Sequence, residues 1–113
     1  MKPLELGEST TPVMEPDLDI RTRRQPPYHV LIENDEHHSM EFVIAMLQKV
    51  FGFSVEKAYE LMMVAHGQGE AVVWTGAKEV AELKCEQVLG MREKHWKSGR
   101  DLGPVGCRIE PAE

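Results

Sequence analysis

The sequence predicts an α+β fold: one small domain of order β-α-α-β-α-β, with a three-stranded antiparallel sheet packed against three helices and a flexible N-terminal tail. The 113 residues suffice for one modest core but not for two. Three stretches repeat apolar residues at helical spacing, and three shorter stretches carry β-branched or alternating patterns. Because the strands are few and interleaved with helices, we expect the helices to pack on one side of the sheet.

The tail is predicted at 1–26, and residues 27–113 are predicted to form the core domain. Residues 1–27 hold five of the seven prolines, with scattered Ser, Thr and acidic residues, and show no sustained periodicity. The tail ends in the basic cluster Arg21-Thr22-Arg23-Arg24. This cluster is interpreted as part of a solvated linker, with contact to an acidic partner as the alternative.

The first predicted elements are a strand and a helix. The stretch from Tyr28 to Glu33 is rich in β-branched and aromatic residues, which favours a strand. Ser39 is a good N-cap for a helix that starts at Met40 and stops at Gly52. The apolar residues of this helix follow the i, i+3, i+4, i+7 series of one face. They are Met40, Val43, Ile44, Leu47 and Phe51.

A second helix and a second strand follow. Ser54 caps the helix, and the turn signal Gly67-Gln68-Gly69 ends it. Glu70 to Trp74 is then predicted as a short strand. One face of the helix carries Val55, Ala58, Tyr59, Met62 and His66. His66 therefore ends an apolar stripe, where a histidine is either a structural residue or a ligand-binding one.

The third predicted helix starts at Thr75 or Gly76 and runs to about Lys97. Its apolar stripe is interrupted by Lys84, which either lays its stem over the apolar surface or presents its charge to a partner. Ser98 to Leu102 is predicted as a loop, and the alternation from Val105 to Glu110 predicts the last strand. The stripe consists of Ala77, Val80, Ala81, Val88 and Met91.

Composition limits the classes of partner and compartment. The formal charge of -6 argues against nucleic acid or an anionic membrane as the main partner. The longest uncharged apolar run, Phe42 to Leu47, is too short to span a bilayer, and the N-terminus shows no secretory signal. Cys85 and Cys107 have no metal-ligand spacing and are interpreted as packing residues in a reduced compartment. We therefore expect a cytoplasmic protein.

Residues capable of binding chemistry concentrate between the first strand and the first helix, in the run Asn34-Asp35-Glu36-His37-His38. Each of these side chains can bind a cation or hydrogen-bond a ligand, and loops between regular elements often hold such groups for use. The alternative is a turn followed by a helix cap, because Asn and Asp favour turns. The residues alone leave both interpretations open.

Four strings of the sequence resemble the ClpS adaptor family. ENDEHHSMEFVIAMLQKVF is similar to the family signature N-D-D-x-T-P-M-E-F-V and the helix that follows it. SVEKAYELMMVAHGQGEA resembles the second helix, the His and Gly turn and the next strand. EVAELKCEQV resembles the third helix, and PVGCRIE resembles the last strand. The resemblance covers about residues 26 to 110, in one order and with few gaps.

The resemblance implies an N-end rule adaptor (N-recognin) and not an enzyme. Members of the family recognise a free amino terminus followed by a bulky apolar side chain. The implied substrates are N-degron peptides and proteins that begin with Leu, Phe, Tyr or Trp. The implied partner is the N-terminal domain of a ClpA/ClpC-type AAA+ unfoldase, which works with the ClpP protease and which the tail engages during delivery. Glu79 and Lys84 match the family's docking positions, with a solvated helix face as the alternative for Glu79.

Recognition of an amino terminus needs acceptors for an ammonium group beside a pocket for a side chain. An ammonium has three donors and no acceptor, so a carboxylate, an amide oxygen and a neutral imidazole nitrogen suit it. Asn34, Glu36 and His66 supply one of each. By resemblance, the α-amino-binding residues are Asn34, Asp35, Glu36 and His66, and the hydrophobic pocket is lined by Ile32, His38, Met40, Val43, Met62, Ala65 and Val105. Without the resemblance, the pocket residues are ordinary core residues.

The chain departs from the family pattern at several of these positions. Glu36 stands where Asp is usual, so its contact with the ammonium must be spaced differently. His38 stands for Thr, and Ser39 stands for Pro. Ala65 and Val105 replace the larger Val and Leu, which should deepen or widen the pocket unless His38 fills the space.

Three alternatives remain beside the adaptor. One is a metal site built from Asp35, Glu36, His37, His38 and His66, although no helical His and Glu spacing typical of zinc enzymes is present. Another keeps the fold as a plain protein-binding module, as in the C-terminal domain of the bacterial ribosomal stalk protein. The third is a ClpS-like protein that binds amino termini without a protease partner. We expect a monomer with no cofactor and no metal, and with neither nucleic acid nor membrane as a partner.

Overall fold

The computed structural model describes residues 25–112. The predicted tail lies outside the described residues except for positions 25 and 26, so it stays a prediction. The elements in chain order are β1 (Tyr28–Glu33), α2 (Met40–Phe51), α3 (Val55–Gln68), β2 (Glu70–Gly76), α4 (Lys78–Leu89), β3 (Glu93–Lys94), β4 (Asp101–Gly103) and β5 (Cys107–Pro111). No helix in this part of the chain is both long and apolar enough to cross a membrane.

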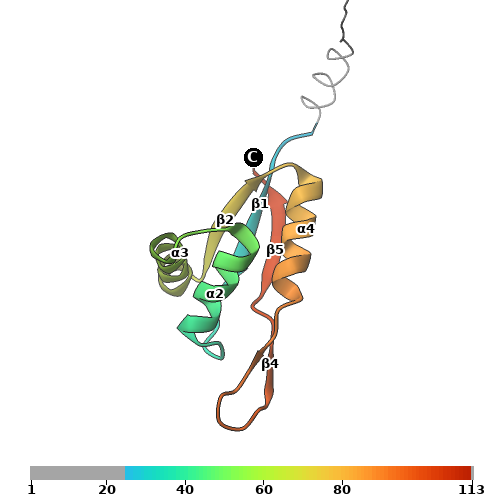
Figure 1. Ribbon diagram of the computed structural model, residues 1–113. Helices are drawn as coiled ribbons and strands as arrows, with labels where there is room; N and C mark the ends of the chain where they lie inside the picture. Colours follow the sequence, from blue (N-terminus) through green and yellow to red (C-terminus); the bar gives the residue numbers. More distant parts are fainter. Residues whose placement is uncertain (1–24, 113) are drawn as a thin grey trace, which may run out of the picture.

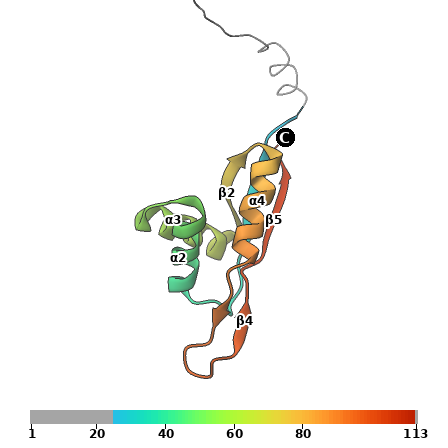
Figure 2. The ribbon, with the colours of Figure 1, turned by 45° about the vertical axis from the view of Figure 1, so that its right-hand side comes forward.

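The main sheet has the order β2-β1-β5, and both neighbours run antiparallel to β1. Ile32 of the central strand pairs with Ala71 on one side and with Cys107 on the other. The three helices lie on one face of this sheet, where α4 runs along β1 and β5, α3 packs against β2, and α2 contacts both other helices (Figures 1 and 2). The predicted α+β class, with a three-stranded antiparallel sheet and three helices, is confirmed.

The core lies between the sheet and the helices, and every buried residue in the described part of the chain is apolar. Burying a large apolar side chain contributes about 1.5 to 3 kcal/mol relative to leaving it exposed. The largest fully buried side chains are Ile32, Met46, Leu47, Val30, Val88 and Val105. Cys85 and Cys107 are free, half-buried thiols, as expected of packing residues. Burial raises the pKa of the Cys107 thiol far above its ordinary value, so it stays protonated.

The caps of α2 and α3 are those that the sequence predicts. The Ser39 hydroxyl oxygen accepts a hydrogen bond from the Phe42 N–H at 3.1 Å, and Ser54 accepts from the Lys57 N–H at the same distance. α2 ends at Gly52, whose φ of 76° lies in the left-handed region that glycine tolerates best. α3 ends at Gln68, and the N–H of its C-cap Gly69 donates to the Ala65 carbonyl oxygen. Ser39 and Gly69 thus cap the first turn of α2 and the last turn of α3, which both contribute to the site described below.

The prediction that the third helix runs to about Lys97 is wrong, because α4 ends at Leu89. Gly90 follows directly, and a glycine costs a helix interior about 1 kcal/mol relative to Ala. The chain then forms an antiparallel hairpin of β3 and β4, which also replaces the loop predicted at Ser98 to Leu102. Its turn contains Gly99 at φ 74°, and an Arg92 to Asp101 ion pair of 2.9 Å crosses its base.

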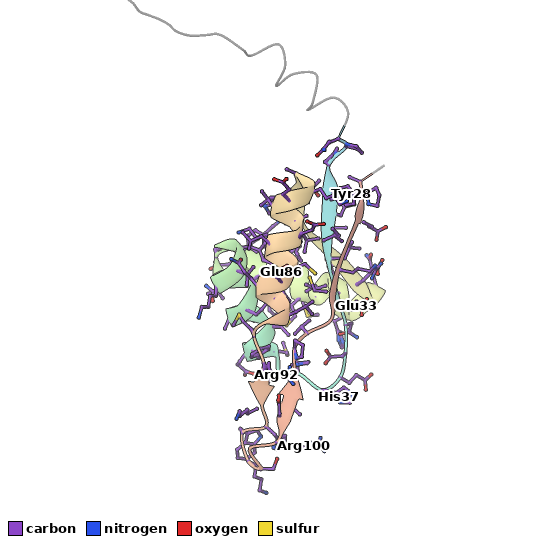
Figure 3. The ribbon with its side chains drawn as sticks, turned by 90° about the vertical axis from the view of Figure 1, so that its right-hand side faces the viewer. Tyr28, Glu33, His37, Glu86, Arg92 and Arg100 are labelled. Atoms are coloured by element: carbon purple, nitrogen blue, oxygen red, sulfur yellow. The ribbon has the colours of Figure 1, made fainter. Side chains whose placement is uncertain are left out.

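The hairpin extends the molecule beyond one end of the sheet. Figures 1 and 2 show it at the bottom of the view, with the C-terminus and the start of β1 at the top. In Figure 3, Tyr28 lies at one end of the main sheet, Arg100 lies near the hairpin tip, and His37 lies beside the hairpin base at Arg92. The loop after β1 therefore meets the hairpin at the end of the sheet that lies away from Tyr28.

Candidate functional site

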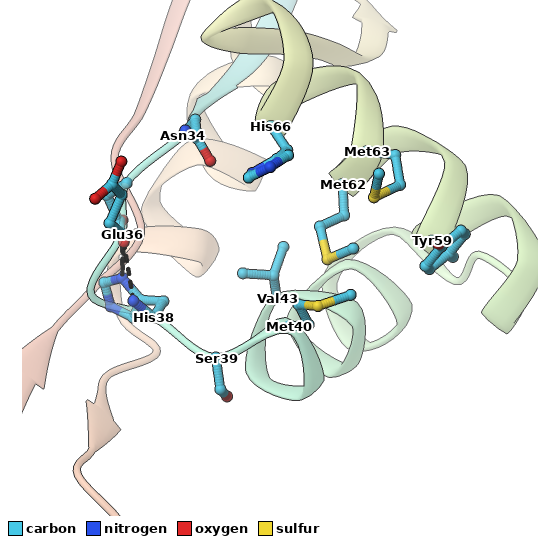
Figure 4. Close-up of a pocket in the computed structure, with 11 residues that line it drawn as sticks. Asn34, Glu36, His38, Ser39, Met40, Val43, Tyr59, Met62, Met63 and His66 are labelled. Atoms are coloured by element: carbon cyan, nitrogen blue, oxygen red, sulfur yellow. Dashed lines mark hydrogen bonds and ion pairs between the residues drawn. The ribbon is translucent and has the colours of Figure 1, made fainter.

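A cavity of about 430 Å³ lies between the loop after β1, the first turn of α2 and the face of α3 that carries Tyr59 and His66 (Figure 4). Its volume is in the range of sites that enclose a whole small ligand, roughly 300 to 1,000 Å³. It brings together every residue predicted for the α-amino group and several of the predicted pocket residues. The lining residues are Asn34, Asp35, Glu36, His38, Ser39, Met40, Val43, Tyr59, Met62, Met63 and His66.

A much smaller cavity, about 30 Å³, adjoins the first on the core side. It is lined by the other predicted pocket residues, Ile32, Ala65 and Val105, which are all buried. Four residues line both cavities, namely Asn34, Asp35, Val43 and Met62, and the last two supply the apolar part of the partition between them. A space of this size holds about one water molecule. A group as large as a Leu or Phe side chain would fit here only if the partition moved, which the flexible Met62 side chain allows.

Two polar side chains converge at the inner end of the larger cavity. Figure 4 shows the Asn34 amide and the His66 ring directed into the same space, from the end of β1 and the last turn of α3. The backbone holds the two elements together, because the Asn34 N–H donates to the Gly69 carbonyl oxygen at 2.9 Å. Glu36 lies on the same loop, but its carboxylate points away from His66. Contact between Glu36 and a ligand at His66 therefore requires a side-chain rotation.

The Asp35 carboxylate is engaged inside the protein. One oxygen accepts the backbone N–H groups of His37 at 2.8 Å and His38 at 2.9 Å, which is the turn that Asp favours. The other oxygen lies 2.8 Å from Nδ1 of His38. Burial raises the pKa of Asp35, but the backbone donors and the His38 side chain outweigh it, so the pKa lies below its usual value. Asp35 is therefore ionised, and its hydrogen bonds hold the conformation of the loop after β1.

His38 joins this loop to the β3–β4 hairpin. Its Nε2 lies 2.8 Å from the carbonyl oxygen of Gly103, and its ring stacks on Phe42 with centroids 5.5 Å apart. Only 4% of the side chain is exposed. Burial lowers the pKa of His38, but the Gly103 carbonyl and the Asp35 carboxylate together raise it by more. The pKa of His38 therefore lies above its ordinary value. His38 lines the larger cavity and not the smaller one, so it does not fill the space beside Ala65 and Val105.

The outer end of the cavity is apolar and open. Met40 begins α2 and is 51% exposed, and Tyr59 on α3 is 47% exposed. Met63 lies one helical turn after Tyr59, and Figure 4 shows both at the side away from Asn34. The sequence prediction omitted Tyr59, Met63 and Ser39 from the pocket. Tyr59 was recognisable, because it shares a predicted helix face with Met62 and His66, whereas Met63 follows only from its spacing to Tyr59.

The two residues predicted to dock on an unfoldase lie on α4, which contributes no residue to either cavity. Glu79 is exposed in the first turn of the helix. The Lys84 ammonium donates to the Val50 carbonyl oxygen at 2.9 Å and lies 5.7 Å from the centre of the Phe51 ring. Lys84 thus satisfies a carbonyl group in the last turn of α2, in agreement with the interpretation that its stem covers apolar surface.

A metal site finds no support in the geometry. Within residues 25–112, no three His, Cys, Asp or Glu side chains come together as metal ligands. Of the residues considered for such a site, Asp35 and His38 bind each other. The arrangement suits a ligand that brings hydrogen-bond donors to the inner end and an apolar group to the partition.

Comparison with known proteins gives consistent matches. Residues 23–99 match the protein family described as "ATP-dependent Clp protease adaptor protein ClpS". A ClpS adapter protein of Ruegeria sp. (strain TM1040) is 39% identical over an alignment of 116 positions, gaps included, which covers 97% of this chain and 96% of the relative. The corresponding protein of Salmonella arizonae is 46% identical over 98 residues, which span 83% of this chain and 85% of the relative.

A solved structure is also similar. Agrobacterium tumefaciens ClpS2 bound to L-phenylalaninamide matches with a TM-score of 0.63 at 33% sequence identity. The match covers 78% of this chain and 99% of that protein. L-phenylalaninamide is a small molecule with a free amino group, a benzyl side chain and an amide.

Proposed function

The chain belongs to the ClpS family of Clp protease adaptors, and on this basis we propose that it is a cytoplasmic N-recognin for N-degron substrates. In this proposal it binds the free α-amino group and the bulky hydrophobic first residue of a substrate and delivers the substrate to a Clp AAA+ protease. The protein itself acts as an adaptor and not as an enzyme.

One observation carries the proposal: a single cavity joins ammonium acceptors to apolar walls. The amide oxygen of Asn34 and a ring nitrogen of His66 are the acceptors that a three-donor ammonium needs. Glu36 completes the set after rotation, and Asp35 adds negative charge from beside the cavity. The first side chain then passes Val43 and Met62 toward Ile32, Ala65 and Val105. L-phenylalaninamide in the related ClpS2 has the same two features, a free amine and a large apolar side chain.

The interactions predict useful but reversible binding. Burial of one large apolar side chain contributes about 1.5 to 3 kcal/mol. Each hydrogen bond to the charged amine contributes about 1.5 to 3 kcal/mol. The gross sum for one side chain and three hydrogen bonds is about 6 to 12 kcal/mol. The cost of ordering a flexible peptide end reduces it, so we expect an affinity no tighter than roughly micromolar, about -8 kcal/mol. An adaptor that must release its cargo needs no tighter grip.

Fluorescence anisotropy with short labelled peptides tests the proposal. Peptides that begin with Leu, Phe, Tyr or Trp should bind, and the same peptides should lose binding after amino-acetylation, which removes the charge and two donors. Peptides that begin with Gly or Asp are the matched controls for the side chain. Equal binding of the free and acetylated forms would overturn the proposal.

The proposed partner is the N-terminal domain of a ClpA/ClpC-type unfoldase, which contacts the α4 surface at Glu79 and Lys84. Because Lys84 already has an internal partner, Glu79 is the better residue for a test. Glu79→Lys should block delivery of a Leu-initiated reporter to the protease and leave peptide affinity unchanged. Undiminished delivery by this variant would show that Glu79 is not a docking residue. Peptide binding by the wild type without any delivery would favour the alternative, a ClpS-like module that binds amino termini without a protease partner.

A further inference from the structure

We propose that His38 is held as an imidazolium that fastens the β3–β4 hairpin to the substrate-binding loop and thereby positions one wall of the larger cavity. The effect on peptide binding rests on the proposed function, whereas the attachment itself does not. His38 is thus a positioning residue, and the hairpin is part of the binding site although it contributes no residue to the cavity lining.

The two hydrogen-bond partners of the ring dictate its protonation. Nδ1 lies 2.8 Å from a carboxylate oxygen of Asp35, and Nε2 lies 2.8 Å from the carbonyl oxygen of Gly103. Both oxygens are acceptors only, whereas a neutral imidazole carries a single N–H. A neutral ring would therefore set a nitrogen lone pair against an oxygen lone pair on one side. With 4% of the side chain exposed, water has little access to relieve that contact.

The surroundings favour the positive charge from every packed element. Asp35 faces the ring from its own loop, Glu93 from β3 and the Gly103 carbonyl from β4, while the Phe42 ring stacks on it from α2. Asp35 and Glu93, the two charged side chains that contribute most to the shift of the His38 pKa, are both carboxylates. The raised pKa of His38 and the lowered pKa of Asp35 agree with an ion pair between the two residues.

The hairpin is attached to the loop at two successive residues. His38 binds Gly103, and the Ser39 N–H donates to the Glu93 carboxylate at 3.0 Å. Glu93 and Gly103 lie opposite each other on the two strands of the hairpin, so both contacts involve the same residue pair. Ser39 is the N-cap of α2, and Met40 follows it. This residue pair of the hairpin therefore positions the start of α2 as well as the part of the cavity wall formed by His38.

The pH dependence follows from the direction of the two shifts. Because the pKa of His38 is raised in the folded protein, its contribution is complete below the ordinary histidine pKa and disappears as pH rises through the raised value. Because the pKa of Asp35 is lowered, its contribution is present above the ordinary carboxyl pKa and disappears as pH falls through the lowered value. The attachment is therefore complete between the ordinary carboxyl pKa and the ordinary histidine pKa, and it loosens as pH rises through the raised pKa of His38.

Nitrogen NMR of the ligand-free protein tests the attachment directly. At neutral pH both ring nitrogens of His38 should show protonated shifts, and titration should occur above the ordinary histidine range. Asp35→Asn keeps an oxygen for the turn but removes the charge, so it should shift this titration to lower pH. His37→Gln, at the exposed neighbouring histidine, is the matched control and should leave it unchanged. A neutral His38 ring at pH 7 would overturn the proposal.

Peptide binding tests the positioning role. His38→Gln can donate to only one of the two acceptors and does not titrate. At pH 6.5 it should bind a Phe-initiated peptide roughly 3- to 10-fold more weakly than the wild type, and the ratio should approach one in mild alkali. The ratio cancels the titration of the peptide amine. Equal affinity at pH 6.5 would overturn the positioning role. If the wild type binds no such peptide, the proposed function fails while NMR still decides the attachment.

Discussion

The two sides of the larger cavity are built from different kinds of interaction. On the His38 side, a carboxylate, an imidazole and a carbonyl oxygen bind in series, and they come from a loop and a hairpin. On the opposite side, Tyr59 and Met63 are exposed apolar residues of the capped helix α3. Hydrogen bonds impose directions, whereas methionine adapts its shape to its neighbours. We therefore expect the first side to set the orientation of a ligand and the second to tolerate variety in it.

The largest expected effect concerns the polar inner end. His66→Ala removes an acceptor for the peptide amine and should weaken binding of a Leu-initiated peptide roughly 10- to 100-fold, as the loss of a charged hydrogen bond of about 1.5 to 3 kcal/mol requires. Anisotropy titration measures the affinity. His37→Ala, which removes an exposed histidine outside the cavity lining, should bind like the wild type. Equal losses in the two variants would show that His66 has no special role.

An intermediate effect is expected where the two sides meet, at Met40. Its side chain stands at the cavity mouth and should crowd first residues that are branched at Cβ. Met40→Ala should strengthen binding of Val- and Ile-initiated peptides roughly 4-fold, about the value of one buried methylene group, and change Leu-initiated peptides less. A competition assay with the peptide panel measures this ratio. An unchanged preference would show that another residue excludes side chains branched at Cβ, and His38 would be the next candidate.

The smallest effect is expected on the adaptable side. Tyr59→Ala should weaken peptide binding roughly 2- to 3-fold. The Tyr59 ring is half-exposed, and a bound peptide would cover only part of it, so the ring contributes less binding free energy than a fully buried side chain. The free energy of unfolding, measured in urea, should change by no more than about 0.5 kcal/mol. Val64→Ala, at an exposed residue of α3 that does not line the cavity, is the control. A 20-fold loss at Tyr59 would show that this side also directs the ligand.

The same contrast explains what the sequence could predict. β1, the caps at Ser39 and Ser54, and the stop at Gly52 depend on neighbours within a few residues, and all four predictions are confirmed. The resemblance supplied Asn34, His66 and the apolar walls, which the structure brings to adjoining cavities. The assignment of these residues to a bound amino terminus stays a prediction.

The missed features depend on distant parts of the chain. Met91 continues the apolar stripe of α4, so local periodicity favours helix where the chain instead forms the β3–β4 hairpin. The contact between His38 and Gly103 joins residues 65 positions apart, and nothing in either neighbourhood indicates it. For the same reason, the sequence could not show that Lys84 would bind Val50.

The position of the chain ends has a mechanical consequence. Tyr28 begins the central strand and pairs with Pro111 near the end of β5, and the Ala112 N–H donates to the Pro27 carbonyl oxygen at 3.0 Å. Force applied between the two termini would open this ladder one rung at a time, from its end. If the rest of the domain is held and only the amino end is pulled, the force acts along β1. It then shears the hydrogen bonds of β1 to β2 and to β5 at the same time. The domain should resist traction from its amino end better than separation of its two ends.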